Sequence, residues 1–322
     1  MIAIRLAALV LLAFNTAAVA QQGPTGYPSR TIRMIVPWPP GGSTDALARI
    51  MANRLTSALG QQVIVDNRPG AGGNIGTAIA AKGSPDGHVM VLVSSSFVVN
   101  PSLYSKVPYD PLKDFQPVSY IASAPSVLLL HPSVKAANVK ELVALTRANP
   151  GTFNCASPGA GTAQHLATEL FRLAAGASIT HVPYTGATMM PAVIGGHVQS
   201  GFISVPAAQP HVASGALRAL AITSLKRSPA MPEVPTFDES GYKGFEVDHM
   251  QGLLVPAGTP RAIVDRINAE IVKGLDDPEI RKRLLFLGFD PVGNKPEEFA
   301  QQIRVQLPKW EKLVKSAGIK VE

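Results

Sequence analysis

The sequence predicts an α/β protein of two doubly wound lobes, joined by a hinge of two crossing strands. Strand-like and helix-like segments alternate from Arg30, and the alternation restarts near residue 139. Two extended segments, residues 118–130 and 245–255, separate the units and provide the crossings. A mature chain of roughly 300 residues is long enough for about two domains of ordinary size. Together these features predict a cleft that closes around a ligand.

The first unit follows a βαβαβ order. Residues 31–36 form a short β-rich run, and apolar residues at helical spacing then predict a helix that ends at Gly60. Two further strands are expected at residues 63–65 and 89–93. This order implies a parallel sheet with helices on both faces.

The second unit repeats the alternation. In order, we expect a helix at residues 139–148, a strand at 153–156, a helix at 162–175, a strand at 179–183, a short helix before Gly195, and strands at 198–205 and 217–223. Only helices are expected after residue 260, and Pro308 interrupts the last of them. The predicted boundaries are residues 27–124 plus 248–322 for lobe 1, and residues 125–247 for lobe 2.

The N-terminal segment has the pattern of a secretory signal. A positive charge at Arg5 precedes an apolar run at residues 6–14, and the small residues Ala18 and Ala20 form a cleavage site. The apolar run is too short to span a bilayer. We therefore expect a signal peptide at residues 1–20, cleaved after Ala20, and a soluble mature protein in the periplasm.

Charge and cysteine content bear on the class of protein. The net charge is +7, which favours anionic ligands, but the Lys and Arg residues are scattered without a basic run. Nucleic-acid binding is therefore not expected.

Cys155 is the only cysteine, which excludes an internal disulfide. Because it lies in an expected strand, we interpret it as a small buried apolar residue rather than a nucleophile.

Two glycine-rich loops are the candidate binding elements. Residues 37–45, PWPPGGSTD, and residues 157–165, SPGAGTAQH, each follow an expected strand and open a helix at a Ser or Thr cap. The free N–H groups and the dipole at such a helix start bind anions, at the sheet edge where α/β folds hold ligands. Either loop alone can equally be an ordinary capped junction. Because each lobe has one such loop, the pair favours a single ligand site formed by both lobes.

No motif predicts catalysis, a cofactor or a metal. The sequence lacks the G-x-S-x-G, H-E-x-x-H and Walker A patterns. Residues 68–76 resemble a dinucleotide fingerprint, but Ile75 takes the place of its final glycine, so we expect no nucleotide cofactor. His165 and Glu169 are spaced like two metal ligands. No third metal ligand is close in sequence. We therefore interpret His165 as a polar residue of the first helical turn and Glu169 as part of a solvent-exposed row of charged side chains.

An ordered set of motifs runs along nearly the whole mature chain. These are YP at residues 27–28, IVPWPPGG at 35–42, VDNRPGAGGNIG at 65–76, PDGH at 85–88, HVPY at 181–184 and LVPAGTP at 254–260. With these motifs the chain resembles the substrate-binding receptors of tripartite tricarboxylate transporters, often called the Bug family.

The resemblance implies a Venus-flytrap receptor, similar to the type 2 periplasmic binding proteins, that delivers a carboxylate to a membrane permease. The implied ligand-binding residues are Pro40, Gly41, Gly42, Thr44 and Asp45 in lobe 1, and Ser157, Gly159, Gly161, Thr162, His165, Tyr184, Gly186 and Ser204 in lobe 2. Asp45 is expected to anchor its loop rather than meet an anionic ligand, because two carboxylates repel each other.

Three functional classes remain open from the sequence. The leading hypothesis is a monomeric periplasmic receptor that captures a small di- or tricarboxylate, or a related acid, for the membrane components of a transporter. The alternative is a receptor that reports its ligand to a membrane sensor kinase, which needs the same closure. An exported enzyme is less favoured because no catalytic motif is present.

Overall fold

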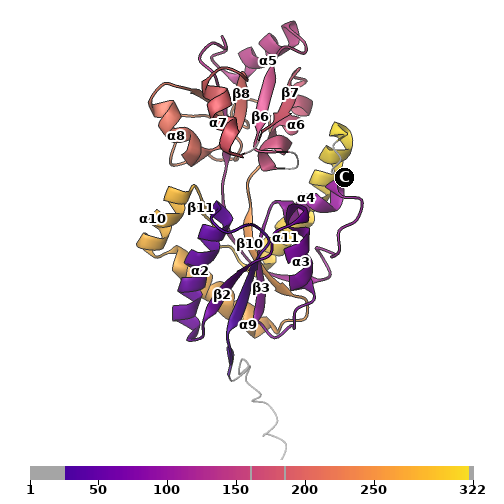
Figure 1. The fold of residues 1–322 in the computed structure, drawn as a ribbon, viewed down its shortest axis with the longest axis vertical. Coiled ribbons are helices and arrows are strands. Elements are labelled where there is room, and N and C mark those ends of the chain that lie inside the picture. Colours follow the sequence, from indigo (N-terminus) through magenta and orange to yellow (C-terminus); the bar gives the residue numbers. More distant parts are fainter. Residues whose placement is uncertain (1–25, 160–161, 185, 319–322) are drawn as a thin grey trace, which may run out of the picture.

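The computed structural model describes residues 26–159, 162–184 and 186–318, which fold into two α/β lobes (Figure 1). The expected signal peptide, residues 1–20, lies outside this part of the chain. Each lobe is built around one sheet, and thin connections join the lobes (Figure 1). The bilobal α/β fold class predicted from the sequence is confirmed.

Lobe 1 contains a six-stranded sheet with the order β11-β4-β10-β3-β1-β2. Its strands are β1 (Ile32–Val36), β2 (Val63–Asn67), β3 (Val89–Ser94), β4 (Phe115–Ser123), β10 (Gln251–Pro256) and β11 (Asp290–Pro291). Its helices are α2 (Ser43–Leu59), the 3-10 turn η1 (Ala71–Gly73), α3 (Asn74–Ala81), α4 (Ser96–Leu103), α9 (Arg261–Leu275), α10 (Pro278–Leu287) and α11 (Pro296–Ala317).

Lobe 2 contains a five-stranded sheet with the order β7-β6-β8-β5-β9. Its strands are β5 (Ser126–Leu130), β6 (Asn154–Ser157), β7 (Thr180–Pro183), β8 (Ser200–Ser204) and β9 (Arg218–Ile222). Its helices are α5 (Val139–Ala148), α6 (Ala163–Ala175), α7 (Gly186–Ile194) and α8 (Val205–Ala213).

In each sheet, one strand brings the chain in from the other lobe and runs against its neighbours. β10 is antiparallel to β3 and β4, and β5 is antiparallel to β8 and β9. The strands β1, β2 and β3 are parallel to one another, as are β6, β7 and β8. Both sheets are therefore mixed rather than wholly parallel, because the crossing strands enter from the edge at which the parallel strands end.

Burial explains why the central strands of lobe 1 are nearly continuous apolar runs. Every residue of β10 is buried, and so is every residue of β3 except the first. Helix α2 packs on this sheet through Leu47, Met51 and Leu55, which share one helical face and are fully buried. The helix ends at Gly60, whose φ of +73° glycine adopts without strain.

Two short segments connect the lobes and are hydrogen-bonded to each other. Ala124 and His249 exchange backbone hydrogen bonds of 3.2 and 3.1 Å, and Pro125 forms an isolated antiparallel bridge with Asp248. A hinge of this kind allows rotation of one lobe against the other. We propose that lobe 1 comprises residues 27–124 and 248–322, and lobe 2 residues 125–247.

Several local features differ from the sequence prediction. Helix α4 follows β3, and helix α8 lies between β8 and β9, where no helix was expected. The short strand β11 pairs with β4, although only helices were expected after residue 260. Helix α11 runs through Pro308 without stopping, because buried side chains on both sides of the proline, Ile303 and Trp310 among them, hold it against the lobe.

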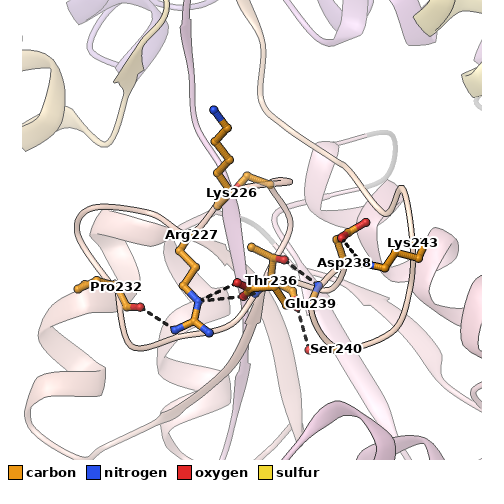
Figure 2. A network of polar contacts seen from close by, with 9 residues as sticks. Lys226, Arg227, Pro232, Thr236, Asp238, Glu239, Ser240 and Lys243 are labelled. Atoms are coloured by element: carbon orange, nitrogen blue, oxygen red, sulfur yellow. Dashed lines mark hydrogen bonds and ion pairs between the residues drawn. The ribbon is translucent and has the colours of Figure 1, made fainter.

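A polar network holds the irregular segment between β9 and the return crossing (Figure 2). The Nε atom of Arg227 donates to both carboxylate oxygens of Glu239 (3.1 and 2.9 Å), and its Nη1 donates to the Pro232 carbonyl (3.0 Å). The Thr236 N–H donates to Glu239 Oε2 (2.9 Å), and the Glu239 N–H donates to Thr236 Oγ1 (3.0 Å). The segment is thus fixed without regular secondary structure.

Candidate functional site

A cavity of about 570 Å³ lies between the two lobes, within the usual range for small-molecule sites. Its wall combines the loops after β1 and β3 in lobe 1, the loops after β6 and β8 in lobe 2, and Ala124 and His249 of the hinge. The cavity therefore lies at the carboxyl ends of parallel strands in both sheets, where α/β folds bind ligands.

Four helices begin at this cavity. The N-cap residues of α2, α4, α6 and α8 are Gly42, Ser95, Thr162 and Ser204, and all four line the wall. The first N–H groups of a helix have no partner within it, and the helix dipole places about half a positive charge at this end. The cavity can therefore receive an anion from both lobes without a cationic side chain.

The loop between β1 and α2 turns at two glycines with different backbone conformations. Gly41 has a φ of +90° and is not part of the cavity wall. Gly42 has a φ of −82° and a ψ of 171°, which is extended backbone, and it lines the cavity. The loop thus presents the second glycine, directly before the helix, to a ligand.

Asp45 lies behind this loop and fixes it. Its Oδ2 atom accepts hydrogen bonds from the Gly41 N–H (3.0 Å) and from Arg49 Nε (2.9 Å). Its Oδ1 atom accepts from Asn67 Nδ2 (2.9 Å), which also donates to the Trp38 carbonyl (3.0 Å). Burial by itself raises the pKa of this carboxyl, but the bonds from Arg49, Gly41 and Asn67 together lower it. Asp45 is therefore ionised at neutral pH and stays outside the cavity wall.

Replacing Asp45 with asparagine is expected to lower the free energy of unfolding by about 1–3 kcal/mol, because a buried, charged acceptor is lost and an NH₂ group faces other donors. The folded-state pKa lies below the unfolded value. The contribution of Asp45 is therefore present above about pH 4 and is lost as pH falls through the folded pKa. Denaturant unfolding of both proteins across this pH window measures the difference.

Asp265→Asn is the matched control for this experiment. Asp265 also pairs with an arginine one helical turn away, Arg261 (2.7 Å), but its side chain is 50% exposed. Exposed ion pairs contribute about 0–1 kcal/mol. An effect of Asp45→Asn no larger than that of the control would contradict the anchoring role.

Hydroxyl groups hold the loop between β6 and α6. Thr162 Oγ1 accepts from the His165 N–H (3.3 Å) and donates to the Gly159 carbonyl (2.8 Å). Ser157 Oγ accepts from the Gly159 N–H (3.2 Å). Of these residues only Thr162 lines the cavity, and Ser157 is fully buried. The hydroxyls fix the start of α6 so that its first turn faces the cavity.

Two stacked histidines lie behind this loop. The rings of His165 and His181 have centroids 3.8 Å apart, and neither ring lines the cavity. Burial lowers the pKa of both to about 4, so both are neutral at neutral pH. His181 Nε2 lies 2.6 Å from Ser157 Oγ, the spacing of a nucleophile and its base. Ser157 is fully buried and outside the wall, so this pair does not reach a bound ligand.

The structure brings some of the expected site residues together and separates others. The cavity wall contains Pro40, Gly42, Thr44, Thr162 and Ser204. Outside the wall lie Gly41, Asp45, Ser157, Gly159, His165 and Tyr184. Tyr184 packs against the apolar core of lobe 2, and Gly186 begins α7. Gly161 lies outside the described residues.

Six further wall residues lie in the two expected loops, although they were not singled out: Trp38, Pro39, Ser43, Pro158, Ala163 and Gln164. The remaining wall residues were not found from the sequence. They are Gly72, Ser94, Ser95, Ser96, Val99, Asn100, Leu103, Tyr104, Ala124, Leu166, His249, Leu287, Gly288 and Phe289. Most of these lie in or directly beside α4, at or just after the end of α10, or in the hinge, which the fold brings to the cavity from distant parts of the chain. The serine run at residues 94–96, directly after an expected strand, is the one local signal that could have revealed a further helix start.

Two α/β lobes, a two-strand hinge and a cavity with helix N-termini from both lobes define the class of two-lobed solute-binding receptors. The family model described as the tripartite tricarboxylate transporter family receptor matches residues 47–319 of the chain. The chain belongs to this family, and the resemblance noted in the sequence is confirmed. The family is one of substrate receptors.

Similar proteins and solved structures agree with this placement. BugT of Bordetella pertussis is 39% identical over 99% of each chain. A UPF0065 protein from the tcbD-tcbE intergenic region of a Pseudomonas species is 40% identical over 96% of this chain and 93% of its own. Rpa4515 of R. palustris, whose structure was solved with adipate, is 34% identical with a TM-score of 0.77, over 91% of this chain and 99% of its own.

Proposed function

We propose that this chain is an exported receptor that captures a small carboxylate between its lobes and delivers it to the membrane components of a tripartite tricarboxylate-type transporter. The observation that carries the proposal is the convergence of four helix N-termini on one cavity. Such N-termini favour anions. The carboxylate found in Rpa4515, which has the same fold, supports this class of ligand.

Within the cavity we propose that the carboxylate lies against Gly42, Thr44, Thr162 and Ser204. Gly42, Thr44 and Ser204 provide N–H groups at helix starts or hydroxyl donors, and Thr162 caps α6, whose first turn faces the cavity. The four residues come from both lobes. A ligand held in this way stabilises the closed arrangement, since it makes contacts in both lobes only when the cleft is shut.

We also propose that the mature protein is periplasmic, after cleavage of residues 1–20. The sequence pattern of the N-terminus supports this, and related receptors such as BugD are described as periplasmic binding proteins. In the part of the chain that the structure describes, no helix combines the length and apolar composition that crossing a bilayer requires.

Thermal unfolding with a panel of solutes tests carboxylate binding. Mono-, di- and tricarboxylates, aromatic acids and amino acids are compared with neutral sugars and alcohols of similar size. A ligand selective for the folded state at about 100 times its Kd stabilises it by ~2.7 kcal/mol, which raises the melting temperature measurably. Stabilisation by neutral solutes and by none of the acids would refute the proposal. Native mass spectrometry of freshly purified protein identifies any acid that stays bound.

Delivery to a transporter is tested separately from binding. In membrane vesicles that contain the transporter's membrane components, uptake of the identified acid is expected to require the receptor and to increase with its concentration. If uptake is independent of the receptor, while the liganded receptor activates a membrane sensor kinase, the sensing alternative replaces transport.

A further inference from the structure

One face of α4 runs along the cavity and carries both polar and apolar side chains. Ser96, Val99, Asn100 and Leu103 all line the wall, at the spacing of a single helical face. Ser96 lies at the helix N-terminus, and Leu103 lies about 10 Å further along the axis at 1.5 Å per residue. The α4 face therefore carries two apolar side chains, Val99 and Leu103, beyond the end that binds the anion.

Further aromatic and aliphatic side chains line the cavity. Trp38, Tyr104 and Phe289 line the cavity, together with Leu287 at the end of α10. The one amide on the α4 face is already used, since Asn100 Nδ2 donates to the Gly72 carbonyl (3.0 Å) and to Asn74 Oδ1 (2.8 Å). This part of the wall provides contact area for an apolar group and no cationic side chain for a second carboxylate.

The described wall contains no Lys, Arg, Asp or Glu. Its one histidine, His249, is neutral at neutral pH because burial lowers its pKa to about 4. Ala160 and Gly161, the neighbouring loop residues outside the described part, have no ionisable side chain. The described wall therefore attracts an anion through N–H groups and helix dipoles, which act within the first turn of a helix, and not through a charged side chain.

We propose that the ligand of this receptor is a monocarboxylate with an apolar body, in preference to a di- or tricarboxylate. The inference rests on the carboxylate-binding function proposed above. The single carboxylate lies at the helix N-termini, and the apolar body lies against apolar wall residues, among them Val99, Leu103 and Leu287. A second carboxylate in that region would lose its water without gaining a cation, which is costly, whereas an apolar group gains from burial.

Hexanoate and adipate test the proposal directly, because they share a six-carbon chain and differ in the second carboxylate. Isothermal titration at neutral pH is expected to give a Kd at least about tenfold lower for hexanoate, which corresponds to ~1.4 kcal/mol. Benzoate is expected to bind more tightly than succinate for the same reason. Tighter binding of adipate or succinate would overturn the inference and leave carboxylate binding intact. Binding of no acid in the wider panel would instead refute the proposed function.

A cation introduced into the apolar wall is the second test. Leu287 is half-buried and ends α10, where a lysine is compatible with the helix dipole. Leu287→Lys is expected to shift the ratio of the two dissociation constants toward adipate by about tenfold. Leu285→Lys is the control, since Leu285 lies on the same helix, is 43% exposed and does not line the cavity. Equal ratios in Leu287→Lys and in the control would overturn the proposed position of the apolar body.

Discussion

Replacing Gly42 with threonine is expected to lower the affinity for carboxylates by at least about tenfold, or ~1.4 kcal/mol, while leaving the fold intact. Gly42 lines the cavity directly before α2, so a β-branched side chain there occupies space beside the anion-binding N–H groups. The backbone tolerates the change, because φ is −82° and a Cβ atom would meet nothing within 4 Å. Threonine and glycine are also about equally good N-cap residues.

The control for Gly42→Thr is a β-branched substitution elsewhere on α2. Ser57→Thr meets this need, since Ser57 is exposed in the last turn of α2 and is remote from the cavity wall. Titration calorimetry gives the affinities, and thermal unfolding without ligand shows that both variants fold. Unchanged affinity in Gly42→Thr would remove the loop after β1 from the binding site.

Replacing Asp248 with asparagine is expected to stabilise the protein, and the gain is expected to increase with pH. Burial raises the pKa of Asp248 from 3.8 to about 8; the charges of Glu246 and Asp290 add to this, and Lys309 opposes it. Tyr120 is the other titratable group in electrostatic contact. The Oδ1 atom of Asp248 is buried without a hydrogen-bond partner. An ionised carboxylate is therefore poorly accommodated beside the hinge.

The sign of the pH dependence follows from linkage. Between about pH 4 and about pH 8 the folded protein keeps the Asp248 proton and the unfolded chain loses it, so wild-type stability falls as pH rises through this window. One pKa unit corresponds to about 1.4 kcal/mol. Asp248→Asn is therefore expected to be nearly neutral near pH 4 and to raise the free energy of unfolding by a few kcal/mol near pH 8.

Asp238→Asn is the control for this effect because its expected sign is opposite. Asp238 accepts hydrogen bonds from Lys243 Nζ and the Gly244 N–H (both 2.8 Å), and these bonds lower its pKa. Its replacement should destabilise the protein slightly at neutral pH. Denaturant unfolding at several pH values measures all three proteins. If Asp248→Asn has the same effect near pH 4 and near pH 8, Asp248 titrates normally and the assignment is wrong.

Much of the fold could be predicted because its elements are encoded locally. The helix that ends at Gly60 and the strand at residues 89–93 follow from apolar periodicity and turn residues, and both are present as α2 and β3. Helix α4 could not be predicted in this way. Its sequence, SFVVNPSL, combines β-branched residues, a proline and a strand-like apolar run, and tertiary packing decides its conformation.

The candidate site could be predicted only where it begins at a glycine-rich loop. Thr162 was recognised because a cap residue before an apolar helix is a local signal. The family resemblance implied His165 at the ligand, but its side chain lies behind the loop against His181, while Ala163 and Gln164 line the cavity. Successive residues of a helix differ by about 100° around its axis, so one position decides between the wall and the interior. Local sequence does not fix that rotation.

The central place of β10 in its sheet has a consequence for the order in which the lobes can be completed. β10 lies between β3 and β4, although it follows both by more than the whole of lobe 2 in the chain. The strands of lobe 2 come from one uninterrupted stretch, β5 to β9. During synthesis, lobe 2 therefore has all its strands before lobe 1 receives its middle one. The cleft forms only when nearly the entire chain is present.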